Sequence, residues 1–223
     1  MRMRQIAALA LAALMMALCG CGAKEEKDRG GAMTIQPAQL SEEEQNLADL
    51  LALGMEDYHI FEFRAEGAKY LELNIYELEN GEWSHLPGGG GIGLLEGNGR
   101  IALTFGRMTE GVRLAVQTKE ANYSASVQIE PGDDVSGMTF ATSALSGSTA
   151  IELDQEIPLT VQIATTKNEI RSYDVDYFGM PREYAKHGYE HVYAVTVTFS
   201  ASDPVGPLLD ASVAPSAEPS PAQ

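Results

Sequence analysis

The sequence predicts an all-β fold: an antiparallel two-sheet β-sandwich, of jelly-roll or Ig-like type, with one short N-terminal helix. Large apolar side chains alternate with polar ones in short runs between residues 58 and 200, which is the period of a strand that buries one face. Glycine, asparagine and proline stand between the runs, where turns need them. Because a single sheet would leave its apolar face in water, two sheets are expected to pack together.

The first twenty residues have the composition of a secretory signal peptide. Arginines at positions 2 and 4 precede an unbroken apolar run from Ile6 to Leu18, and a basic start followed by a short apolar core is typical of such signals. A membrane-spanning helix needs roughly 20 apolar residues, so this run is too short to be one. We therefore expect residues 1–20 to be removed by processing.

The end of the apolar run, Leu18-Cys19-Gly20-Cys21, resembles the bacterial lipobox, in which an aliphatic residue and two small residues precede a cysteine. The resemblance implies a bacterial lipoprotein whose mature chain begins at Cys21, with acyl chains such as palmitate on that residue. Two acyl chains suffice for stable attachment to a bilayer. The implied location is the cell membrane, lipid-anchored on the extracytoplasmic face; an ordinary cleaved signal without lipid is the alternative.

Composition divides the rest of the chain into three parts. Residues 21–39 mix charges with glycine and are expected to form a flexible tether. Residues 40–201 are expected to form the β-sandwich domain, and the chain's 44% of hydrophobic residues is enough for a sizeable core there. Residues 202–223 hold five of the ten prolines and are expected to be a disordered tail rich in Pro, Ser and Ala.

A short helix is predicted at the start of the domain. Ser41 and Glu44 have the spacing of a capping box, in which each side chain bonds the other residue's backbone N–H. Leu47, Leu50 and Leu51 follow at helical spacing. A helix with one apolar stripe is expected to lay that stripe on the main domain.

Seven strands are predicted from alternation, at residues 58–64, 71–75, 101–105, 112–117, 123–129, 157–164 and 193–200. Pro158 lacks the N–H that a sheet ladder needs, which favours an edge position for its strand. Between residues 178 and 188, a long connection with one helical turn after Met180-Pro181 is expected.

The charge balance excludes one class of partner. The chain has 32 acidic and 15 basic residues and a formal net charge of −17. Such a surface repels phosphate backbones, so nucleic acid is not an expected partner.

Three motifs that carry chemistry elsewhere are interpreted here as structural. Residues 88–93 match G-x-G-x-x-G, but a strand rather than a helix follows them, which favours a flexible loop between strands over a dinucleotide site. Residues 187–191 match H-x-x-E-H, but they lead into a β-branched strand, whereas a zinc protease needs both histidines on one helix. Glu152, Asp154 and Glu156 alternate along an acidic edge that is expected to be solvated, with a weak Ca²⁺ site as the alternative.

No catalytic residue, metal ligand or cofactor is therefore assigned, and the chain is not expected to be an enzyme. The candidate ligand-binding residues are Tyr70, Tyr76, Trp83, Tyr173 and Tyr177. The first three lie on or just past the polar side of the second predicted strand, and the last two lie in an aromatic-rich segment before a long connection. Exposed aromatics can stack on sugars or anchor a protein partner. The alternative is that they pack against the sheet or plug one end of the sandwich.

The function these observations favour is a lipid-anchored extracytoplasmic binding or interaction protein, non-enzymatic, with an extracellular protein or glycan as partner. The alternative is a carbohydrate-binding β-sandwich module of the cell surface. Of the partners, only the membrane is implied by specific residues, through a lipid on Cys21.

Overall fold

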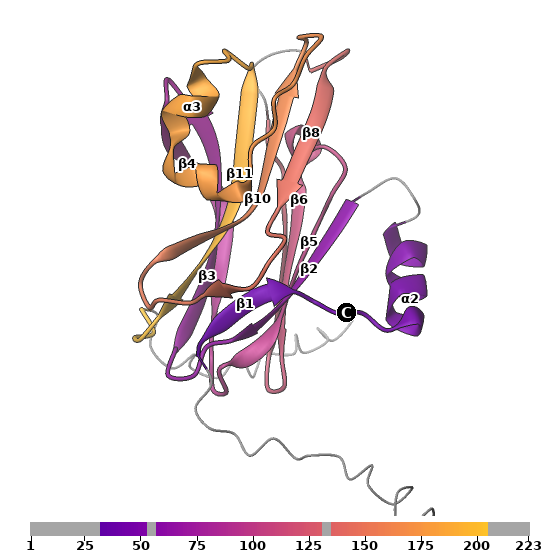
Figure 1. The fold of residues 1–223 in the computed structure, drawn as a ribbon. Helices are drawn as coiled ribbons and strands as arrows, with labels where there is room; N and C mark the ends of the chain where they lie inside the picture. Colours follow the sequence, from indigo (N-terminus) through magenta and orange to yellow (C-terminus); the bar gives the residue numbers. More distant parts are fainter. Residues whose placement is uncertain (1–31, 53–56, 131–134, 205–223) are drawn as a thin grey trace, which may run out of the picture. The chain divides into compact units, whose positions relative to one another are not determined.

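A computed structural model of the chain describes residues 32–52, 57–130 and 135–204. The predicted signal, Cys21, most of the predicted tether and the tail from residue 205 lie outside these ranges. The described residues form a β-sandwich of two antiparallel sheets, as the alternation predicts (Figure 1).

Each sheet has its own strand order. Among the described residues, six strands form sheet A in the order β7-β6-β5-β2-β1-β9: β1 (Thr34–Pro37), β2 (Asp57–Arg64), β5 (Asn98–Phe105), β6 (Val112–Thr118), β7 (Asn122–Val127) and β9 (Thr149–Ala150). Five form sheet B in the order β4-β3-β11-β10-β8: β3 (Tyr70–Glu79), β4 (Glu82–Gly93), β8 (Thr139–Ala144), β10 (Glu156–Thr165) and β11 (His191–Ser200). The helical elements are α2 (Glu42–Ala52), η1 (Met108–Glu110), η2 (Val175–Gly179) and α3 (Pro181–Ala185).

All seven predicted strands are present, together with four that alternation does not reveal: β1, β4, β8 and β9. Strand β1 corrects a predicted boundary, because Thr34–Pro37 pairs with β2 inside the segment expected to be tether. Ile35 at its centre is fully buried. The sandwich therefore begins before residue 40.

The core lies between the sheets, where the predicted apolar faces meet. On sheet B, Leu73 pairs with Val197 and Ile75 pairs with Val195, and all four side chains are completely buried. On sheet A, Phe61 lies opposite Ile101 in the same buried layer. Alternation therefore predicts correctly which side chains of these strands face the core.

Pro158 does not lie on an edge strand, contrary to the prediction. Strand β10 is internal, paired with β11 on one side and β8 on the other. The missing N–H is tolerated because the pairing with β8 begins only at Thr160, and the pairing with β11 shifts register between Pro158 and Thr160. Proline at a bulge or beyond the end of a neighbouring strand costs no ladder bond.

The bulge also reverses the alternation of β10, so that beyond it the polar side chains face inward and the apolar ones outward. Beyond it, Gln162 pairs with the inward-facing Tyr193 and bonds the connection between β5 and β6, accepting from the backbone N–H of Met108 at 2.6 Å. Val161 and Ile163 consequently face outward, yet both are buried. One end of sheet B therefore needs a cover on its outer side.

The glycine run at residues 88–91 is part of strand β4 and not a loop, which corrects the sequence interpretation. It forms a bulge opposite β3, where the register shifts between Leu73 and Ile75. Gly88 has a φ of +111°, and a Cβ on Gly89 would lie 2.3 Å from the carbonyl oxygen of Leu73. The run is glycine because backbone approaches backbone there.

Candidate binding surfaces

Four of the five candidate ligand-binding residues are brought together, on the outer face of sheet B. Elements η2 and α3 lie over this face (Figure 1). The side chains there form what we call the aromatic cap: Tyr76, Trp83, Tyr173, Tyr177, Phe178 and Tyr184. The cap covers the end of the sheet where β10 turns its apolar residues outward, so these side chains pack against the sheet, which is the alternative given above.

Trp83 is half-buried in the aromatic cap, where it contacts Phe178. Its ring stacks on Phe178 with centroids 4.9 Å apart, and its Nε1–H donates to the backbone carbonyl of Phe178 at 2.8 Å. Burial and a hydrogen bond to Glu156 raise the pKa of Tyr76. The ring face that stacks on Phe178 and the indole N–H are therefore not free to bind a sugar.

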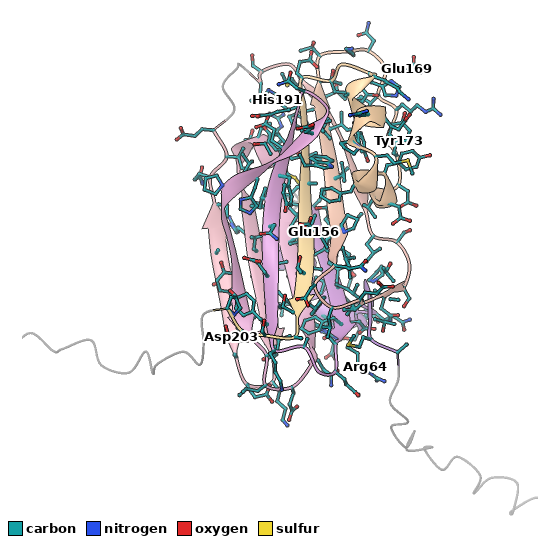
Figure 2. The ribbon with its side chains drawn as sticks, turned by 90° about the vertical axis from the view of Figure 1, so that its left-hand side faces the viewer. Arg64, Glu156, Glu169, Tyr173, His191 and Asp203 are labelled. Atoms are coloured by element: carbon teal, nitrogen blue, oxygen red, sulfur yellow. The ribbon has the colours of Figure 1, made fainter. Side chains whose placement is uncertain are left out.

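The two late tyrosines stack on each other at the same end of the sandwich. Tyr173 and Tyr177 have ring centroids 4.5 Å apart, and Tyr173 meets the buried Tyr184 edge-on at 5.2 Å. Figure 2 shows Tyr173 beside the helical turns, at the opposite end of the molecule from Arg64. Burial raises the pKa of Tyr184.

Tyr70 does not join the aromatic cap. It lies at the other end of β3, where it is buried and packs over Gly91. Burial raises the pKa of its hydroxyl group.

The two histidines of the H-x-x-E-H motif have separate hydrogen-bond partners. His187 bonds the Tyr173 hydroxyl at 2.6 Å, and the buried His191 bonds Glu77 at 2.9 Å through Nδ1. Hydrogen bonds from the hydroxyl groups of Thr165 and Thr166 lower the pKa of Glu190 to about 2. Within the described ranges, no group of three His, Cys, Asp or Glu side chains is placed to hold a metal ion.

The carboxylates of the acidic edge also have separate hydrogen-bond partners. Glu156 accepts a hydrogen bond from the hydroxyl of Thr196 at 2.5 Å, whereas Glu152 accepts one from the side chain of Gln155, also at 2.5 Å. The carboxylates of Glu152 and Glu156 therefore have different partners.

Helix α2 is present, and its capping box is made as predicted. The Ser41 backbone N–H donates to Glu44 at 2.9 Å, and the Glu44 N–H donates to the Ser41 hydroxyl at 3.2 Å. The Arg100 guanidinium donates to Glu44 at 2.7 Å. This bond, with those from Ser41, lowers the pKa of Glu44 to about 2.

The side of α2 that faces the domain is polar, contrary to the prediction. Besides Glu44, it uses Gln45 and Asp49, which both bond the hydroxyl of Tyr58 on β2. The predicted apolar stripe points away: Leu47, Leu50 and Leu51 are 57%, 67% and 70% exposed. The spacing of the leucines predicts the stripe but cannot say which side of the helix meets the sheet.

A hollow on the outer face of sheet A is a feature that sequence reasoning missed. It has a volume of about 560 Å³, and its lining comes from β1, β2, β5, β6 and the turn after β6. Three of its side chains are cationic: Arg64, Arg100 and Lys119. Nothing in the sequence marks it, because its residues are the polar members of alternating strands and the turn after them.

Comparison with family models, with curated proteins and with solved structures finds no match to this chain. In the part of the chain that the structure describes, no helix is both long and apolar enough to cross a membrane.

Proposed function

We propose that this chain is a lipid-anchored extracytoplasmic interaction protein without catalytic function, and that helix α2 is its contact surface. The lipobox sequence ending at Cys21 supports the anchor. The observation that carries the interaction is the reversed orientation of α2, because an amphipathic helix ordinarily turns its apolar stripe to the core.

The reversed orientation is held by specific contacts. The capping box fixes the start of the helix, Arg100 holds Glu44, and Tyr58 donates to Asp49 at 2.7 Å. These bonds use the polar side, so the leucines are presented outward. Each leucine side chain that is fully removed from water contributes about 1.5–3 kcal/mol, which is a large gain for a partner that covers all three.

The charges around the leucines indicate the kind of partner. Helix α2 carries four acidic residues and no basic one. A second copy of the chain would bring the same acids against them, and an anionic bilayer would repel them. The partner that fits is a protein with an apolar groove rimmed by lysine and arginine, which binds the helix through residues at i, i+3 and i+4 spacing.

Site-specific photocross-linking in the producing cells tests this proposal. A photoreactive residue at Leu50 is expected to give one cross-linked protein, and the control position Glu79, which is exposed on sheet B, is expected not to give it. That protein, once purified, should bind the full chain and lose about tenfold or more in affinity when Leu47 and Leu51 are changed to Gln.

These leucines are exposed, so the two substitutions should leave the unfolding free energy within about 0.5 kcal/mol of the wild type. Identical products from positions 50 and 79 would contradict the assignment of α2. A product with the mass of two copies of this chain would mean that the surface is a dimer interface.

The carbohydrate-binding alternative has no support from Trp83, whose ring and N–H are already engaged. It is favoured instead by the hollow on sheet A, on the opposite face of the sandwich from the aromatic cap.

A further inference from the structure

The hollow on sheet A is built from one row of side chains that crosses four strands. Gln36 lies opposite Glu62, Glu62 opposite Arg100, and Arg100 opposite Gln117. Arg64 and Asn98 form the next pair along the sheet. Its volume of about 560 Å³ falls in the range of small-molecule sites, roughly 300–1,000 Å³.

Cationic side chains outnumber carboxylates in the lining of this hollow, three to one, although the chain is strongly acidic. The described residues contain ten lysines and arginines, and three of them line this one hollow. Since the formal net charge is −17, the rest of the surface repels anions. A local cluster of cations is then a place where an anion can bind.

The three cations differ in how they are held. Arg100 donates to Glu44 at 2.7 Å, which fixes its guanidinium. Lys119 lies 3.3 Å from Glu96 in an exposed pair, and such pairs contribute little and are easily exchanged. Arg64 is exposed and makes no ion pair with any described residue. Its planar guanidinium can bond both oxygens of a carboxylate or phosphate.

The remaining residues that line the hollow can form hydrogen bonds with the hydroxyl groups of a ligand. Gln36, Asn98 and Gln117 offer both amide donors and amide acceptors, and Glu62, which accepts from Gln36 at 2.7 Å, offers a further acceptor. The amide oxygens and the carboxylate are acceptors, and a sugar offers several hydroxyl groups that can donate to them. We propose that the hollow binds a polyhydroxylated anion: a sugar that carries a carboxylate or a phosphate.

This inference does not depend on a partner binding the leucines of α2 or on the lipid. The hollow and α2 share only the bond between Arg100 and Glu44, on the polar side of the helix. The ligand is expected to have several hydroxyl groups and one anionic group. Both carboxylated and phosphorylated sugars meet this description, and the experiment uses a separate probe for each.

Calorimetric titration of the full chain in a neutral detergent tests the proposal with three probes: glucuronate, glucose 6-phosphate and glucose. At least one anionic probe is expected to bind about tenfold or more tightly than glucose, because glucose cannot form a charge-assisted hydrogen bond with Arg64. Arg64→Gln should weaken that probe about tenfold.

Arg182→Gln is the matched control, because it removes the same charge from an exposed position on α3, over the other sheet. It should change the affinity less than about twofold, as expected for a charge far from the ligand. Absence of binding by both anionic probes, equal binding of glucose, or an equal loss from Arg64→Gln and Arg182→Gln would each overturn the proposal. None of these outcomes alters the cross-linking result expected at Leu50.

Discussion

Replacing Gly89 with alanine is expected to lower the free energy of unfolding by about 3 kcal/mol. The new Cβ would lie 2.3 Å from the carbonyl oxygen of Leu73 and 3.3 Å from the Cα of Asn74. Both are backbone atoms of the neighbouring strand β3, so no side chain can rotate to relieve the contact. Strand β4 must move away from β3 or lose its pairing there. Urea unfolding followed by Trp83 fluorescence measures the loss, because Trp83 lies on the same strand.

Gly147→Ala is the control for that substitution. Nothing lies within 4 Å of the position that its Cβ would take, so its unfolding free energy should stay within about 0.5 kcal/mol of the wild type. If Gly89→Ala were as stable as Gly147→Ala, the glycine run would be no more than a permissive linker, as the sequence alone suggests.

Replacing Glu77 with alanine is expected to cost about 2 kcal/mol of stability. The carboxylate of Glu77 accepts from Nδ1 of the buried His191 at 2.9 Å, and the Tyr193 hydroxyl lies 3.3 Å from the same nitrogen. The Nε2 atom of His191 is buried without a partner among the described residues. Loss of the carboxylate would therefore leave a buried imidazole with one weak contact.

Thermal and urea unfolding of two companion variants check this reason. Glu77→Gln keeps an oxygen that can accept from His191, so it should cost clearly less than Glu77→Ala. Glu79→Ala, at an exposed position on the same strand, should have almost no effect. Equal stability of the Glu77 and Glu79 alanine variants would show that the bond to His191 contributes nothing.

The fold was predictable from the sequence because most strands bury one face. Residues such as Leu71, Leu73 and Ile75 show this alternation directly, and the sandwich follows from it. Strand β4 was missed because glycine carries no side chain to alternate. Strand β1 was missed because four residues are too few for a period, although Ile35 is a core residue.

The candidate surfaces were predictable only in part. The late aromatic segment stands out in the sequence, but its role as a cover depends on the bulge after Pro158, which turns Val161 and Ile163 outward. Apart from the proline, nothing in the sequence around β10 indicates this reversal. The hollow on sheet A depends on which strands are neighbours, and residues as distant as Gln36 and Gln117 meet only in the folded sheet.

The most direct test of the account is the intact mass of the protein purified from the membranes of its producing cells. The anchored interaction protein proposed here should begin at Cys21 and carry the added mass of two or three acyl chains. A chain that keeps residues 1–20, or one released from the cells with a free thiol on Cys21, would contradict it.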